Sequence, residues 1–347
     1  MENKIVILTH TDNFFGQTRK PWVSMDINKI LAEFANENMS VHHYNIHEVF
    51  NKNIELRDKI IIYSFSQKEN VRNYIKDIIY FLSHHNRIIP SLDLLYCHED
   101  KGYQELLKKR LGFDSLNALY FSSFKDLRNY DIKYPVVLKT VDGSNGKGVF
   151  LIHSKKELYK KIHSLNNRGN LLTSLDLLRR KYLRKKKFKH YPGHDDREDY
   201  YQYRHYITRE KNYILQEYIP GLDHDYRILV LYDKYYITKR HVNKGDFRAS
   251  GTKKFDFNFK VDYSLLDYAK NVFAKFNTPI LSIDIMSRNN KYYLGEYQAL
   301  HFGINVFIKS NGYYIEAGDS WKFIENKSHI EKELAMAFIK YIKTDQV

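Results

Sequence analysis

The sequence contains very little cysteine and no long apolar stretch. Cys97 is the only cysteine among 347 residues, which excludes a disulfide framework and a metal cluster built from several thiolates. No run of about 18 apolar residues occurs, which excludes an ordinary membrane-spanning helix. No charged segment followed by an apolar one opens the chain, and we therefore expect a cytoplasmic protein.

Acidic residues are outnumbered by basic ones. Lys and Arg total 56 against 41 Asp and Glu, which gives a formal net charge of +15 at pH 7. An excess of this size favours acidic partners such as nucleotides, polycarboxylates or nucleic acid. The chain is also rich in Lys, Asn, Ile and Tyr together, as the product of an AT-rich coding sequence would be. Compositional bias is therefore an equally good explanation of the charge.

Strand and helix patterns alternate through the first part of the chain. Apolar strand patterns occur at residues 4–9, 41–46, 59–64 and 87–89. Apolar residues at helical spacing lie between them, at Ile27, Ile30, Leu31 and Phe34 and again at Val71, Tyr74, Ile75, Ile78 and Leu82. Such alternation predicts a parallel sheet with helices on its faces. A chain of 347 residues has room for two or three lobes, and we assign residues 1–96 to the first.

The most informative segment runs from Tyr134 to Val149, where an apolar strand delivers a lysine and opens into a glycine-rich loop. Glycine lets backbone N–H groups approach an anion without a side chain in the way. The predicted phosphate contacts are Lys139, Gly143, Ser144, Asn145, Gly146, Lys147 and Gly148. Taken alone, such a loop is a weak signal, and later segments give it weight.

Oxygen-bearing side chains accompany three strand patterns further along the chain. They are Asp225 just after residues 213–219, Asp284 within residues 281–285, and Glu296 and Gln298 within residues 293–298. We expect Asp284, Glu296 and Gln298 at the ends of neighbouring strands. Oxygen ligands of this kind suit Mg²⁺ that bridges nucleotide phosphates, and Mn²⁺ would serve in the same way.

Residues 166–212 interrupt the pattern, and we expect a long loop there, since no periodicity is evident. The loop contains a basic run at residues 179–187. This run is either a solvated, partly helical surface insertion or a docking strip for an acidic polymer. The nearby His190, His194, Asp195 and Asp196 have no spacing that fixes a metal-ligand geometry.

In their order and spacing these segments resemble the ATP-grasp superfamily, above all carboxylate–amine ligases of the RimK and D-alanine–D-alanine ligase type. The resemblance covers roughly residues 90–305. It implies an α/β protein with α+β lobes: an ATP-grasp fold behind an N-terminal parallel-sheet domain. The central lobe would span residues 97–215, with the glycine-rich loop and the insertion, and the C-terminal lobe residues 216–347, with the metal site.

The resemblance implies a nucleotide site. The family's two phosphate-contacting lysines match Lys139 and Lys101, which follows Asp100 at the start of a predicted helix. Its adenine hinge matches Glu217, Tyr218 and Ile219, and its ribose-binding acid matches Asp225. The substrate that follows from these matches is ATP.

The resemblance also implies catalytic and metal residues. The RimK-like Asp-x-Arg pattern is present as Asp225-Tyr-Arg227, and the more discriminating Gly-Asp-Phe-Arg segment ends at Arg248. We predict Arg227, Arg240 and Arg248 as catalytic residues. The family's metal motif matches Asp284, Glu296 and Gln298. Individually each residue has an ordinary structural explanation, and their joint order decides the assignment.

Three departures from the family pattern limit what it implies. Gln298 replaces the usual asparagine, so its carbonyl oxygen is one methylene further from the backbone and a second metal would sit differently. Residues 299–303 replace the usual small-Pro-Gly turn. Ser282 stands where D-alanine ligases place a carboxylate-binding arginine, which disfavours that activity.

The implied reaction joins a carboxylate to an amine. ATP would phosphorylate the acid to an acyl phosphate, and the amine would then displace phosphate to form an amide or peptide bond. The predicted partners are a small-molecule or peptide carboxylate and an amine acceptor, with homo-oligomers common among such ligases. Two alternatives stay open: a small-molecule kinase resembling inositol-phosphate kinases, and a non-catalytic nucleic-acid-binding protein built around the basic insertion.

Overall fold

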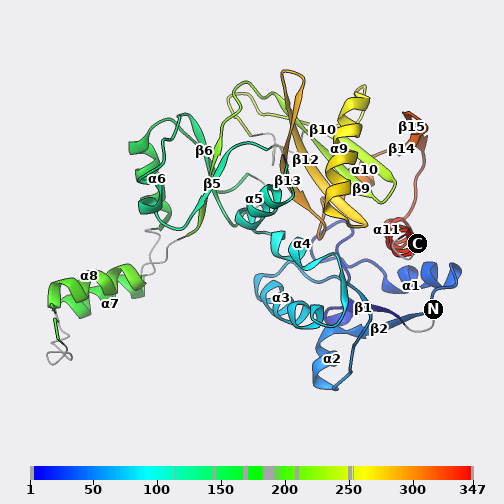
Figure 1. The fold of residues 1–347 in the computed structure, drawn as a ribbon, viewed down its shortest axis with the longest axis horizontal. Coiled ribbons are helices and arrows are strands. Elements are labelled where there is room, and N and C mark those ends of the chain that lie inside the picture. Colours follow the sequence, from blue (N-terminus) through cyan, green and yellow to red (C-terminus); the bar gives the residue numbers. More distant parts are fainter. Residues whose placement is uncertain are drawn as a thin grey trace. The chain divides into compact units, whose positions relative to one another are not determined.

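The computed structural model describes residues 4–113, 115–143, 146–166, 171–182, 192–193, 195–207, 211–248, 252 and 254–344. The chain folds into two compact units (Figure 1). The larger unit comprises Met1–Leu116, Ser144–Gly146 and Ile219–Val347, and the smaller unit comprises Asn117–Gly143 and Lys147–Tyr218. The division into three lobes at residues 96 and 215 stays a prediction.

The larger unit begins with a four-stranded parallel sheet in the order β2-β1-β3-β4. Its strands are β1 (Ile5–Thr9), β2 (Val41–Asn45), β3 (Ile60–Tyr63) and β4 (Arg87–Ile89), which confirms the four predicted strand patterns. Successive side chains of β1 point to opposite faces, and all five are buried. Helices therefore cover both faces, as the sequence predicts.

The two faces of this sheet have different helical partners. Ile5 and Ile7 pack in one apolar cluster with α1 (Ile27–Asn36) and α11 (Ile330–Thr344). Val6 and Leu8 pack in another with α2 (Ile46–Asn51) and α3 (Glu69–Ser83). A short 3-10 helix, η1 (Thr11–Asn13), follows β1.

A second, antiparallel sheet forms the rest of the larger unit, in the order β13-β12-β9-β10-β14-β15 with β11 beside β10. Its strands are β9 (His224–Leu231), β10 (Lys234–His241), β11 (Phe255–Asp256), β12 (Ile280–Arg288), β13 (Lys291–Gln298), β14 (Gly312–Ala317) and β15 (Ser320–Glu325). One face packs on α9 (Tyr263–Phe276), and the other contributes Leu229 and Ile280 to the cluster around α11. A short helix, α10 (Asn305–Lys309), follows β13. We call this sheet the large sheet.

Two helices follow β4, α4 (Leu92–Cys97) and α5 (Lys101–Arg110), and α5 packs against the large sheet. Asp100 caps α5 by accepting a hydrogen bond from the Tyr103 backbone N–H at 2.8 Å. The Gln104 side chain donates to the carbonyl oxygen of Tyr297 at 3.1 Å. Lys108 Nζ donates to the carbonyl oxygen of Gly295 at 3.0 Å. These contacts fix α5 against β13.

The smaller unit contains a four-stranded antiparallel sheet in the order β5-β8-β6-β7. Its strands are β5 (Ala118–Phe121), β6 (Val136–Thr140), β7 (Val149–Ile152) and β8 (Tyr213–Glu217). One face packs on α6 (Lys155–Asn166) through Leu158 and Ile162. A 3-10 helix, η2 (Phe124–Leu127), follows β5.

The long loop predicted at residues 166–212 is wrong for the described part of that segment. Two helices occupy it, α7 (Leu171–Tyr182) and α8 (Asp196–Ile207), and they lie side by side (Figure 1). The Asp195 carboxylate accepts hydrogen bonds from the backbone N–H groups of Arg197 and Glu198, which starts α8. This outcome favours the partly helical interpretation of the insertion.

None of the helices in the described part of the chain combines the length and hydropathy that crossing a bilayer requires.

Candidate active site

Charged side chains from three adjacent strands meet on one face of the large sheet. In the strand register Arg227 of β9 lies opposite Asp284 of β12, and Asp225 of β9 lies opposite Arg240 of β10. Asp225 and Arg227 are two residues apart, so both point to the same face of β9. All four residues were selected from the sequence, and pairing between strands brings them together. We call them the charged quartet.

The charged quartet is linked by short, charge-assisted hydrogen bonds. Arg227 donates to both oxygens of Asp284, at 2.6 Å from Nε and 2.7 Å from Nη2. Arg240 donates to both oxygens of Asp225, at 2.7 Å from Nε and 2.5 Å from Nη2. The same Nη2 lies 2.8 Å from Oδ2 of Asp284, and the Arg240 side chain is only 4% exposed. Two positive and two negative charges thus balance in a buried position.

Burial and contacts within the charged quartet shift the pKa values of its members. Burial opposes ionisation of Asp284, yet Arg227 and Arg240 outweigh it and lower the pKa of this carboxyl to about 2. Burial, together with the negative charge of Asp284, raises the pKa of Asp225 despite its contact with Arg240. The two carboxylates keep the pKa of the Arg240 guanidinium raised although burial acts against it. Arg240 therefore carries its charge at any working pH.

The predicted metal residues lie on the two strands at one edge of the large sheet. Asp284 lies inside β12, so its predicted place at a strand end is wrong, whereas Gln298 ends β13. A β-bulge separates the paired residues Ile283 and Ile285 and brings the Gly295 backbone close to Asp284. A Cβ at position 295 would lie 3.0 Å from the Asp284 carbonyl oxygen, so this close approach favours glycine.

The donor set suits a hard cation. Asp284, Glu296 and Gln298 offer oxygen atoms only, as Mg²⁺ and Mn²⁺ prefer, and both of the last two are half-buried. Oδ1 of Asp284 accepts from Arg227 alone and keeps a further lone pair, whereas Oδ2 lies within hydrogen-bond distance of both Arg227 and Arg240. Among the described residues, no three His, Cys, Asp or Glu side chains group as a metal centre. A metal site built on Asp284 and Glu296 would therefore need the amide oxygen of Gln298 as a third donor.

The glycine-rich loop follows β6 and precedes β7, and these two strands pair antiparallel in the smaller unit. The Thr140 backbone N–H donates to the Gly148 carbonyl oxygen at 2.9 Å, and Thr140 Oγ1 donates to the Asp142 carbonyl oxygen at 2.6 Å. Gly148 has φ +77°, and a Cβ there would lie 2.1 Å from Thr140 Oγ1. Glycine is therefore required at position 148 both by backbone conformation and by space.

The other loop residues are described in part. Gly143 and Gly146 also have positive φ, and Lys147 is exposed. Lys139 lies in β6 and pairs with Val149 in the strand register. Ser144 and Asn145, the remaining predicted phosphate contacts, lie outside the described residues.

Arg248 lies in the chain between β10 and β11 and forms a bidentate pair with Asp246. Its Nε and Nη2 lie 2.9 Å from Oδ1 and Oδ2 of that carboxylate. Its Nη1 donates to the Gly146 carbonyl oxygen at 3.0 Å, and Gly146 belongs to the larger unit. The Arg248 side chain is 37% exposed, which makes it far more accessible than Arg240.

The other predicted nucleotide contacts fall at element boundaries. Lys101 is the first residue of α5 and is nearly buried. Glu217 ends β8, where its carboxylate accepts a hydrogen bond from Asn117 Nδ2 at 3.2 Å. The chain passes from the smaller to the larger unit between Tyr218 and Ile219. The predicted hinge therefore coincides with the junction of the two units.

A cluster of buried polar side chains in the larger unit was not predicted from the sequence. Gln17 Oε1, Tyr63 Oη and both ring nitrogens of His98 and His301 find no hydrogen-bond partner of good geometry among the described residues. The two imidazole rings lie 5.1 Å apart, and Phe65 packs edge-on against both. Burial lowers the pKa of both histidines, to about 3 for His301. Both are therefore neutral at physiological pH.

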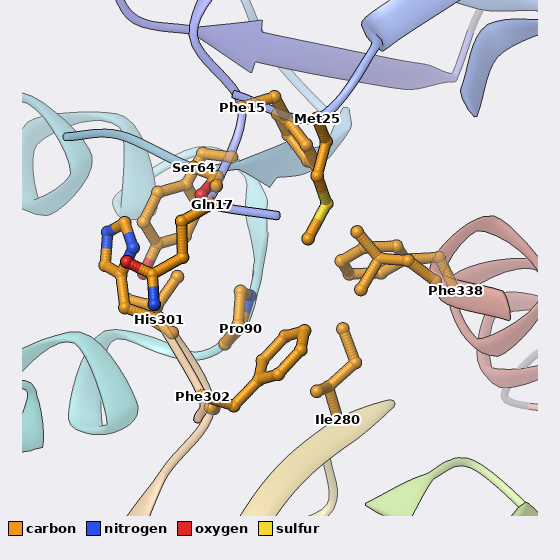
Figure 2. A pocket seen from close by; sticks show the side chains of 14 residues that line it. Phe15, Gln17, Met25, Ser64, Pro90, Ile280, His301, Phe302 and Phe338 are labelled. Carbon is orange, nitrogen blue, oxygen red and sulfur yellow. The ribbon is translucent and has the colours of Figure 1, made fainter. Parts of the chain in front are cut away.

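Three of these polar residues, Gln17, Tyr63 and His301, line a cavity of about 30 Å³, enough for about one or two water molecules. Figure 2 shows Gln17 and His301 on one side of it and the apolar Phe302 and Phe338 on the other. The sequence offered one signal for this polar cluster: residues 299–303 depart from the family pattern, and His301 lies among them, three positions after Gln298.

A separate groove of about 540 Å³, formed mainly by residues 18–29 and 304–331, contains none of the predicted site residues.

Comparison by sequence finds no family model and no curated protein that matches the chain. Solved structures match its fold. D-cycloserine synthetase DcsG aligns with a TM-score of 0.52 at 11% identity, over 97% of this chain and 98% of that chain. The ATP-grasp ligase PsnB, solved with precursor peptide PsnA2 and AMPPNP, aligns with a TM-score of 0.51 at 11% identity, over 98% and 99%. N5-carboxyaminoimidazole synthetase from Staphylococcus aureus, solved with ADP, aligns with a TM-score of 0.50 at 10% identity, over 88% of this chain and 73% of that chain.

The chain therefore has the ATP-grasp fold, which confirms the predicted fold class, including the N-terminal parallel sheet. Identities of 10 to 11% establish this fold alone.

Proposed function

We propose that this protein is an ATP-dependent carboxylate–amine ligase, which forms an amide or peptide bond and releases ADP and phosphate. The observation that carries the proposal is the charged quartet beside Glu296 and Gln298 on one face of the large sheet. The proposal is also supported by the ATP-grasp fold and by the names of two similar structures, a ligase and a synthetase.

The proposed site manages negative charge. A carboxylate approaches the γ-phosphate of ATP only when cations neutralise both groups. Lys101, Lys139, Arg248 and the backbone N–H groups around Gly148 would provide this neutralisation. Mg²⁺, bound by Asp284, Glu296 and Gln298, would neutralise further phosphate charge. No side chain needs to act as a covalent nucleophile.

The chemical steps follow from this arrangement. A carboxylate oxygen attacks the γ-phosphorus, the bond to the β-phosphate oxygen breaks, and ADP leaves. The amine then attacks the acyl carbon, loses a proton, and phosphate departs with the electron pair of the C–O bond. Exclusion of water by the glycine-rich loop would protect the acyl phosphate from hydrolysis.

The three predicted arginines take different parts in the proposal. Arg240 is buried against Asp225 and Asp284, so we assign it to positioning these carboxylates. Arg227 would share that role through Asp284. Arg248, on an accessible loop, is the arginine assigned to contact the transferred phosphoryl group.

The experiment is ADP release from ATP and Mg²⁺ across pools of amino acids, short peptides and sugar acids, with and without hydroxylamine. ADP accompanied by a hydroxamate would establish carboxylate activation and identify the acid. ADP accompanied by a stable phosphorylated alcohol would establish the kinase alternative. Absence of both nucleotide turnover and nucleotide binding would overturn either enzymatic function.

A further inference from the structure

Helix α7 carries an apolar stripe on its exposed surface. Leu172, Leu175, Leu178 and Tyr182 are 69%, 53%, 54% and 66% exposed. Spacings of three, three and four residues keep these side chains on one side of an α-helix. The stripe extends over about 15 Å, at 1.5 Å per residue. We call these four residues the α7 stripe.

Leu175 and Leu178 lie on the side of α7 away from α8, the helix that packs beside α7 (Figure 1). Asp176 and Arg180 lie on the opposite side of α7 and contact α8. Arg180 Nη2 donates to Asp199 Oδ2 at 2.9 Å, and its guanidinium lies 3.8 Å from the Tyr203 ring centroid. The Tyr203 hydroxyl donates to the Asp176 carboxylate.

An ion pair and a hydroxyl hydrogen bond join α7 to α8, whereas the α7 stripe stays exposed. A contiguous apolar stripe left in water indicates an interaction surface.

Positive charge flanks the α7 stripe. Arg179 and Lys181 are exposed, and on the helix they lie to either side of Leu178 and Tyr182. Lys181 Nζ lies 5.0 Å from the centroid of the Tyr182 ring. The sequence continues this charge, since seven of the nine residues 179–187 are Lys or Arg. Residues 183–191 lie outside the described residues, and the proposed surface does not include them.

We propose that the outer face of α7 docks on an anionic lipid surface. Leucines bordered by basic side chains match the in-plane binding of amphipathic helices: the apolar side chains enter the boundary between headgroups and acyl chains, while Arg179 and Lys181 meet anionic headgroups. Long basic side chains bordering an apolar stripe can extend along it and keep their charges at the headgroups.

Other occupants fit these observations less well. A peptide helix binds in a groove, whereas the stripe belongs to a single helix. Nucleic acid binding uses aromatic stacking platforms, and three of the four stripe residues are leucines. A second copy of this chain would bring two equally basic surfaces together.

The test uses the full-length protein and sedimentation with vesicles. One vesicle preparation contains phosphatidylcholine alone, and the other contains phosphatidylcholine and phosphatidylglycerol in equal parts. We expect at least about tenfold stronger partitioning onto the second, weakened by added salt. The double variant Leu175→Asn and Leu178→Asn should lose about tenfold or more of this binding. Tyr206→Asn, an exposed aromatic residue of α8 outside the stripe, is the matched control and should bind as the parent does.

Circular dichroism of each variant verifies that the fold is kept, since all the substituted side chains are exposed. Equal binding to both vesicle types, or undiminished binding of the double variant, would overturn the proposal. So would a dimer, or an oligonucleotide complex, that the double variant abolishes while vesicle binding is absent. Leu175 and Leu178 lie outside the residues assigned to the ligase site, so this test does not depend on the proposed reaction.

Discussion

Arg240 donates two hydrogen bonds to Asp225, and the two residues lie opposite each other on neighbouring strands. The same guanidinium reaches Asp284 on a third strand at 2.8 Å. One buried cation thus holds two of the carboxylates that the sequence assigns to nucleotide and metal binding. The stability of the large sheet and the geometry of the proposed site therefore depend on the same contact.

Replacing Arg240 with methionine should destabilise the protein strongly. The substitution leaves Asp225 without its bidentate partner in a buried position, and loss of one partner of a buried ion pair typically costs about 3 to 5 kcal/mol. Urea unfolding measures the change. Arg248→Met is the control, because Arg248 is partly exposed and its loss should cost about 1 kcal/mol or less. Similar losses for the two variants would contradict the importance of the quartet.

Glu296→Gln should abolish turnover while the fold is kept. The substitution retains the shape and one carbonyl oxygen but removes the negative charge that the proposed metal site needs. We expect turnover to fall about 100-fold, with the melting temperature changed by about 2 °C or less. Glu325→Gln, at the exposed end of β15, is the matched control. Full turnover of Glu296→Gln would remove this residue from the site.

Gly148→Ala should distort the glycine-rich loop. The new Cβ would lie 2.1 Å from Thr140 Oγ1 at a positive φ, and we expect a loss of about 2 to 3 kcal/mol in stability with weaker ATP binding. Gly221→Ala provides the control, since Gly221 has φ +75° but nothing within 4 Å of its Cβ position. That variant should lose only about 1 kcal/mol.

A double variant separates steric crowding from backbone strain at the loop. Thr140→Ala removes Oγ1, so adding it to Gly148→Ala should recover part of the lost stability. Calorimetric titration with ATP and denaturant unfolding measure both effects. If the double variant loses as much stability as the two single variants together, the contact with Thr140 is not the cause of the destabilisation.

The buried histidines should make stability depend on pH. Burial lowers the pKa of His301 from 6.5 to about 3, and Arg72 acts in the same direction. The unfolded chain therefore binds a proton at His301 that the folded chain does not bind between about pH 3 and pH 6.5, and stability falls as the pH decreases through this window. For His301 alone we expect a loss of about 2 kcal/mol between about pH 7.5 and pH 5.

Substitution of both histidines tests this assignment. His98→Phe combined with His301→Phe should flatten the pH dependence of unfolding over the same window, because phenylalanine binds no proton. The exposed His84 is the control, and His84→Phe should leave the dependence unchanged. An unchanged dependence in the double variant would assign the effect to other groups.

Features that depend on neighbours along the chain were predicted correctly from the sequence. Continuous apolar runs identified β1 and β3, because strands with helices on both faces of their sheet bury successive side chains. The helix start at Lys101 was predicted, and the structure shows Asp100 as its N-cap, which acts on a backbone N–H group only three residues away. The glycine-rich loop around Gly148 was predictable for the same reason, since a positive φ favours glycine at the position that adopts it.

Burial was predicted less well than secondary structure. The leucines of α7 have helical spacing, yet the segment was assigned as a loop, and the structure leaves Leu175 and Leu178 exposed. Periodicity states which side chains share a face of a helix, but what covers that face depends on the packing of other elements.

By itself, the sequence determined the order of the strands along the chain, the helix start at Lys101, the glycine-rich loop and the identity of the charged residues. Only the tertiary structure decided that Arg240 pairs with both Asp225 and Asp284, and that His98 meets His301 inside the larger unit. The physical reason is the distance along the chain over which each interaction acts. Backbone conformation and capping act within a few residues, whereas buried ion pairs and ring contacts require a strand register that brings distant segments together.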